Sequence, residues 1–291
     1  MLSRIKQQAW LQPWMPRLRL WRRRWDELRH SPALWQEERA SRSWAARHFS
    51  QADLVEDALR QVERQGGYFG GWALSRSALR TLCACLFTRT RPLIVEWGSG
   101  QSTLFWSFLQ PLLPFGFIGI EHDPYWYRQL SQRVALAGDF QYRLAGLKQL
   151  SAAEWASLWQ APEQAFRLYP DMGSPVAESE YANTRLANGF YAVDCGELFE
   201  PGSIDAIVLD GPNGNGRALA FALLYPFLKP DAWILIDDYD HYPFLEQLGR
   251  LYAYSLEHVQ IQAGKRWCLV RLQGPLSKGL SEQGAEAPLS D

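Results

Sequence analysis

The stretch that decides the fold is Ile94-Val95-Glu96-Trp97-Gly98-Ser99-Gly100-Gln101-Ser102-Thr103. Apolar residues lead into an acidic residue, a glycine turn follows, and small hydroxyl residues then open a helical pattern. Because glycine has no Cβ, a strand that ends in this way can bring its backbone N–H groups close against a bound ligand. The stretch therefore predicts a strand, a ligand-binding turn and the first residues of a helix.

Three further strand-like runs end in acidic residues. They end at Glu121, at Asp210 and at the pair Asp237-Asp238. In open α/β sheets, ligands bind outside the carboxyl ends of the strands, near the point where the strand order reverses. Glu121 follows Gly100 by 21 residues. This spacing along the chain is typical of a carboxylate that accepts hydrogen bonds from ribose hydroxyls. We expect these strand ends to form one site.

The alternation of strand-like and helical runs predicts the fold class. Strands are expected at 92–97, 116–121, 140–145, 204–210, 232–237, 255–261 and 266–272. This alternation is typical of an α/β, Rossmann-like fold with a seven-stranded, mostly parallel sheet covered by helices on both faces. Only residues 262–265 separate the last two strands, which is too short for a crossover helix. We therefore expect a terminal antiparallel hairpin.

The same patterns divide the chain into three parts. Residues 1–65 are expected to be a basic, Trp-rich helical extension, 66–273 the main domain, and 274–291 a disordered tail. Residues 146–203 are too long for a single connection and predict an inserted subdomain or lid. Apolar residues make up 47% of the chain without a run of about 18, and the four cysteines form no CxxC pair. These features favour a cytoplasmic protein.

Charge is distributed unevenly along the chain. Residues 1–30 hold eight basic and two acidic residues, a net charge of +6, so the remainder carries −7. The apolar stripe of Leu18, Trp21, Trp25 and Leu28 has two open roles. It packs on the main domain or on a second copy in a homo-oligomer, or it lies on the inner face of a membrane as a peripheral anchor. The body has no basic surplus, so no nucleic acid partner is expected.

With these motifs in place, residues 70–272 resemble the class I S-adenosylmethionine-dependent methyltransferases. The closest resemblance is to bacterial methyltransferase-like proteins with a VEWGSGxST…IEHD…DGPNG…IDDYD pattern. It implies S-adenosylmethionine as the cofactor. A nicotinamide site would need a third glycine where this chain has Thr103. The resemblance implies cofactor-binding roles for Glu96, Gly98, Ser99, Gly100, Ser102, Thr103, Glu121, His122 and Asp210.

Methyl transfer to oxygen requires that the acceptor proton be removed or polarised. Two chemistries are open: His241 beside Asp238 acts as the base, or Asp210, Asp237 and Asp238 gather Mg²⁺. The metal arrangement resembles catechol O-methyltransferases, but no lysine follows Asp210 within residues 211–217. Macrolide-sugar O-methyltransferases, which pair such aspartates with a histidine, are the nearer resemblance. His241, Asp238 and Asp210 are the catalytic candidates.

Two residues of the loop after Asp210 are candidate substrate contacts. The two Asn-Gly steps at 213–216 predict a mobile, donor-rich turn that includes Asn213, and Arg217 is suited to clamp a carboxylate or phosphate. The chain also holds 14 Trp, 12 Tyr and 14 Phe, which permits stacking on a sugar. The expected acceptor is a hydroxyl of a small molecule or glycan. The alternative is a non-catalytic methyltransferase-fold protein that uses its N-terminal helices as a docking surface in assembly.

Overall fold

The computed structural model describes residues 32–33, 35–71, 73–134, 138–183, 186–261 and 266–276. Predictions for the basic segment 1–30, the hairpin loop 262–265 and most of the tail lie outside these residues. Residues 35–48 are helical. Over the described ranges, no helix is both long enough and apolar enough to cross a membrane.

The main sheet has seven strands in the order β3-β2-β1-β7-β8-β10-β9; β10 pairs antiparallel with both β8 and β9, and the other neighbouring pairs are parallel. This arrangement confirms the predicted fold class, terminal hairpin included. β8 and β9 begin earlier than expected, because each continues through residues that the sequence pattern assigned to the preceding connection. The strands are β1 Leu93–Trp97, β2 Gly116–Glu121, β3 Phe140–Leu144, β7 Ile204–Leu209, β8 Leu228–Asp237, β9 Tyr252–Gln260 and β10 Trp267–Pro275.

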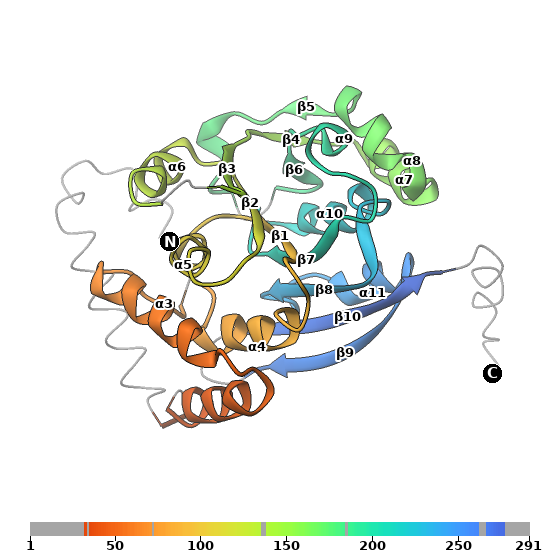
Figure 1. Cartoon of the computed structure of the whole chain (residues 1–291). Helices are drawn as coiled ribbons and strands as arrows, with labels where there is room; N and C mark the ends of the chain where they lie inside the picture. The colour runs from red at the N-terminus through yellow and green to blue at the C-terminus, as the bar shows by residue number, and fades with distance from the viewer. Residues whose placement is uncertain are drawn as a thin grey trace, which may run out of the picture.

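Helices cover both faces of this sheet (Figure 1). Alternate residues of β1 separate the two cores: Ile94 packs under the N-terminal helices, whereas Val95 and Trp97 belong to the opposite core. Central strands are apolar on both faces for this reason, and every residue of β7 is buried. On one face lie α3 Ala52–Arg64, α4 Arg76–Leu86, α5 Gln101–Leu109 and α6 Pro124–Ser131, and on the other α10 Leu219–Leu223 and α11 Phe244–Gly249.

The segment between β3 and β7 builds a second, three-stranded sheet in the order β5-β4-β6. Its strands are only two or three residues long, too short to leave a periodic signal in the sequence, so this sheet was not predicted. Helices α7 and α8 of the same segment pack against α10. The elements are β4 Leu147–Gln149, α7 Ala152–Gln160, α8 Pro162–Leu168, β5 Ser174–Pro175, β6 Gly189–Tyr191 and α9 Cys195–Leu198.

A buried arginine joins the N-terminal helices to one another. Arg80 on α4 is 1% exposed, and its guanidinium bonds the carboxylates of Glu56 on α3 and Glu38 on the helix 35–48. It also donates to the hydroxyl of Ser41 at 3.1 Å. A buried guanidinium is tolerated when its N–H groups have hydrogen-bond acceptors in this way. Removing one member of such a cluster leaves the charges of the other members without a partner.

Replacing Arg80 by alanine is therefore expected to lower the free energy of unfolding by about 3–5 kcal/mol. Arg60→Ala is the matched control, because Arg60 makes an exposed ion pair with Asp57 on α3. Such a pair is screened by solvent and contributes little to stability. Urea unfolding of both variants measures the difference, and equal losses would contradict the stated role of Arg80.

Candidate functional site

The strand order reverses between β1 and β7, because the chain leaves β1 towards β2 and returns on the other side to β7. A ligand crevice is expected at the carboxyl ends of strands flanking such a point. β1 carries Glu96 there, and Asp210 follows β7 directly. Glu121 ends β2 and Asp237 ends β8. The fold thus brings the four predicted acidic strand ends to one edge of the sheet (Figure 1).

Two glycine turns meet at this reversal point. A Cβ added to Gly98 would lie 2.5 Å from the nitrogen and 2.7 Å from the Cα of Gly211. Gly98 also has a φ of +88°, which side chains disfavour. The carbonyl of Trp97 accepts hydrogen bonds from the N–H groups of Asp210 and Gly211, at 2.9 and 2.7 Å. The two turns therefore pack backbone against backbone.

Glu121 is held as an anion at the end of β2. One oxygen accepts from the N–H and the hydroxyl of Ser99, at 2.9 and 2.6 Å, and the other from the N–H groups of His122 and Asp123. Burial raises the pKa of this carboxyl, but hydrogen bonds and charge from His122, with those from Asp123 and Ser99, outweigh it and leave the pKa below its ordinary value. The hydroxyl of Ser99 also bonds that of Tyr142 at 2.7 Å.

Glu96 has the opposite electrostatics. Its carboxyl is fully buried and accepts from the hydroxyl of Thr103, which in turn accepts from the N–H of Gly100 at 3.0 Å. Burial raises the pKa of Glu96 to about 7, and the hydrogen bond from Thr103 offsets this only in part. Ser102 and Thr103 are themselves buried. Thr103 therefore acts inside the protein, as a helix-start residue that orients Glu96.

Gly100 is the open side of the turn. A Cβ added there would meet no atom within 4 Å, and the φ of −176° is extended backbone that any residue adopts. The physical constraint that favours glycine therefore differs between positions 98 and 100. The first is required by packing within the protein, whereas the space beside the second is free for a ligand.

Replacing Glu96 by glutamine is expected to remove a pH dependence of stability. The carboxyl titrates near 4.5 when unfolded and near 7 when folded, so the folded state holds more protons between these values. The free energy of unfolding therefore falls by roughly 3 kcal/mol as pH rises from 4.5 through 7. Urea midpoints of both proteins at pH 5 and pH 8 measure this. Parallel pH profiles of stability for the two proteins would contradict this prediction. Glu121 does not interfere in this pH range, because its depressed pKa confines its effect on stability to lower pH.

His241 and Asp238 lie in the turn after β8. The N–H of His241 donates to the carbonyl of Asp238 at 3.0 Å, and the ring Nδ1 lies 3.9 Å from an Asp238 carboxylate oxygen. The His241 side chain is 59% exposed. The structure thus places two of the catalytic candidates, His241 and Asp238, next to each other on a solvent-facing turn.

The predicted Mg²⁺ site does not assemble. Asp210, Asp237 and Asp238 are all described, and over the described residues no three His, Cys, Asp or Glu side chains gather closely enough to hold a metal ion. The backbone explains part of this result. Asp237 ends β8 as a buried residue, whereas Asp238 adopts a φ of +50° and turns into the pairing with His241. The donor set does not fit Mg²⁺.

Arg217 has a different role from the predicted substrate clamp. It is 6% exposed, and its guanidinium donates to the carbonyls of Pro212, Asp237 and Asp210, at 3.3, 2.7 and 3.0 Å. Because these N–H groups of the guanidinium donate to main-chain carbonyls, Arg217 links the turn after β7 to the end of β8. Asn213 is exposed, and its contact with a substrate stays a prediction.

The glycines of the same loop are used for packing and not for mobility. A Cβ on Gly214 would lie 2.2 Å from the carbonyl oxygen of Leu186, and one on Gly216 would overlap the carbonyl oxygen of Gly189. Asn215 adds hydrogen bonds of 2.8 Å to the main chain and the side chain of Asn188. The loop therefore packs directly against the inserted segment.

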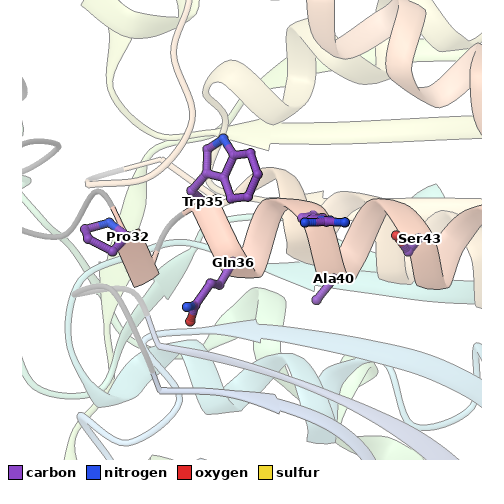
Figure 2. Close-up of a pocket in the computed structure, with 6 residues that line it drawn as sticks. Pro32, Trp35, Gln36, Ala40 and Ser43 are labelled. Atoms are coloured by element: carbon purple, nitrogen blue, oxygen red, sulfur yellow. The ribbon is translucent and has the colours of Figure 1, made fainter.

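A hollow of about 730 Å³ lies elsewhere, along the helix 35–48 and the residues before it. Figure 2 shows its lining side chains following one another along this helix. It contains none of the strand-end residues, so it is not the candidate site. Its lining residues are Pro32, Trp35, Gln36, Arg39, Ala40 and Ser43.

Sequence reasoning missed two tyrosines at the strand ends. Tyr142 on β3 reaches the Ser99–Glu121 pair, and Tyr191 on β6 reaches the glycine turns. The alternation of aromatic and polar residues from Phe140 to Arg143 was a usable signal for Tyr142, and the structure buries both aromatic residues. Tyr191 had no such signal, because its strand comes from the inserted segment.

No protein-family model matches the chain, and no curated protein matches it significantly. Several solved structures resemble it. A transferase from Pyrococcus horikoshii superposes with a TM-score of 0.34 at 12% identity, over 67% of this chain and 62% of its own. Precorrin-6y C5,15-methyltransferase from Geobacter metallireducens gives 0.39 at 10%, over 72% and 94%. An RNA methyltransferase from Salinibacter ruber, bound to S-adenosyl-L-homocysteine, gives 0.36 at 10%, over 69% and 94%. Likenesses this distant assign no activity to this chain.

Proposed function

We propose that the protein is an S-adenosylmethionine-dependent methyltransferase that acts on a hydroxyl group of a small molecule or glycan. The observation that carries this proposal is the open glycine turn at Gly100, flanked by the carboxyls of Glu96 and Glu121 at the reversal point of the sheet. The terminal antiparallel hairpin supports a methyltransferase over a nicotinamide-binding protein, as does Thr103 in place of a third glycine.

The residues at the strand ends fit this cofactor. Glu121 is suited to the ribose hydroxyls, and a ribose hydroxyl would take the position of the Ser99 hydroxyl at the carboxylate. Glu96 would sit by the amino acid part, where an ammonium group favours the ionised carboxyl and lowers its pKa from about 7. The space beside Gly100 admits the ligand close to the backbone.

Gly100→Ala is expected to weaken binding of S-adenosylhomocysteine about tenfold or more, because the added methyl group occupies the ligand's space. The unliganded protein should keep its thermal midpoint, since the Cβ meets nothing within 4 Å. Isothermal titration of the full chain measures the affinity.

The matched control for this binding experiment is Gly249→Ala at the end of α11. Its Cβ would make an ordinary contact of 3.6 Å with Tyr254, away from the glycine turn. This variant should bind the ligand as the natural protein does. If the natural protein binds neither S-adenosylmethionine nor S-adenosylhomocysteine, the proposed function is wrong.

The chemistry proposed for the site is a direct displacement at carbon. Bound S-adenosylmethionine supplies a methyl group activated by its positively charged sulfur. The protein's part is to hold the acceptor in line and to take its proton. We propose that the imidazole of His241 accepts that proton, with the Asp238 carboxylate orienting the ring and stabilising its charged form.

His241→Ala is expected to lower kcat by about 100-fold or more with an active acceptor, because general-base catalysis is lost. Affinity for S-adenosylhomocysteine should not change. His48→Ala is the control, since His48 lies on the helix 35–48 beside Trp44. Methylation of hydroxylated sugars and phenols, followed by mass spectrometry, measures the rates. An unchanged kcat in His241→Ala would remove this residue as the base.

A further inference from the structure

The inserted segment places one buried tyrosine at the glycine turns. Tyr191 ends the short strand β6, which pairs with β4 in the second sheet. A Cβ added to Gly211 would lie 2.5 Å from the Tyr191 hydroxyl and 2.9 Å from the Cα of Gly98. The phenol therefore comes from far along the chain to the point where β1 and β7 end.

The ring of Tyr191 is held on several sides. Its centroid lies 5.2 Å from that of Trp97 and 5.5 Å from that of His122. Its main-chain carbonyl accepts a hydrogen bond of 3.0 Å from the hydroxyl of Tyr169. The side chain has 0% exposure, so the hydroxyl is shielded from bulk water.

The Tyr191 hydroxyl makes no hydrogen bond within the described part of the chain. Leaving a buried donor unsatisfied is costly, and such groups in native proteins normally have a partner. Other buried phenols of this protein follow that rule: Tyr169 donates to the carbonyl of Tyr191, and Tyr252 to that of Phe221. Tyr191 is the exception, and it lies at the candidate site.

The charges around this hydroxyl support the same interpretation. Burial raises the pKa of Tyr191 well above its ordinary value; the charges of Glu121, Asp210 and Glu96 raise it further, and Arg217 opposes them. The phenol thus stays protonated and keeps a hydrogen to donate. All four groups belong to the strand ends or the loop after β7, so the hydroxyl lies among the site residues.

We propose that Tyr191 is a ligand-contacting residue, that its hydroxyl hydrogen-bonds the bound S-adenosyl ligand, and that the inserted segment forms a wall of the cofactor site through it. This inference rests on the proposed function, because it takes the strand-end ligand to be an S-adenosyl compound. It assigns to the segment 146–203 a part in cofactor binding, in addition to any contact with the acceptor.

The test is Tyr191→Phe, which removes the hydroxyl and keeps the ring. S-adenosylhomocysteine should bind this variant about tenfold more weakly, the loss expected for one buried hydrogen bond. Its thermal midpoint without ligand should equal or exceed that of the natural protein, since an unsatisfied donor is removed. A merely structural tyrosine would instead lose stability and keep its affinity.

Tyr252→Phe is the matched control, because it removes a buried hydroxyl that has a partner, at the distant edge strand β9. It should lower the thermal midpoint and leave the affinity unchanged. Wild-type affinity in Tyr191→Phe would overturn the inference while the proposed function stands. Failure of the natural protein to bind either S-adenosyl compound would overturn both.

Discussion

The site depends on the close approach of two glycine turns, the one after β1 and the one after β7. With Gly98 against Gly211 there is no room for any side chain, and the Trp97 carbonyl closes the contact with two hydrogen bonds. This contact sets the relative positions of the strand ends at the reversal point. The other features of the proposed site lie around this contact. They are the carboxyls beside the turns, the open space at Gly100 and the phenol of Tyr191.

The two glutamates beside these turns show how environment separates identical side chains. Glu121 receives main-chain and hydroxyl donors at both oxygens and remains an anion. Glu96 is buried deeper, with fewer donors, and its pKa rises to about 7. A ligand with sugar hydroxyls at one end and an ammonium group at the other suits this division, since the hydroxyls need a fixed acceptor and the ammonium stabilises a carboxylate that is otherwise costly to ionise.

Sequence patterns predicted the elements of the main sheet well, because strands in a parallel sheet are apolar runs punctuated by glycine and acidic residues. Predictions made from the residue type alone were less successful where one side chain suits two roles. Arg217 has the donors to clamp a substrate anion, but burial directs them to three carbonyls. The Asn-Gly steps from 213 to 216 predict a mobile turn, yet Gly214 and Gly216 serve close packing against residues 186–189.

The sequence by itself determined the sheet, its terminal hairpin and the identity of the acidic strand ends, since these follow from local periodicity and from residues adjacent in the chain. Only the tertiary structure decided which of these groups meet. It kept Asp210, Asp237 and Asp238 from forming a metal site, and it brought Tyr191 to Gly211. The physical reason is that burial and contact between distant segments control hydrogen bonding and charge, and local sequence does not record either.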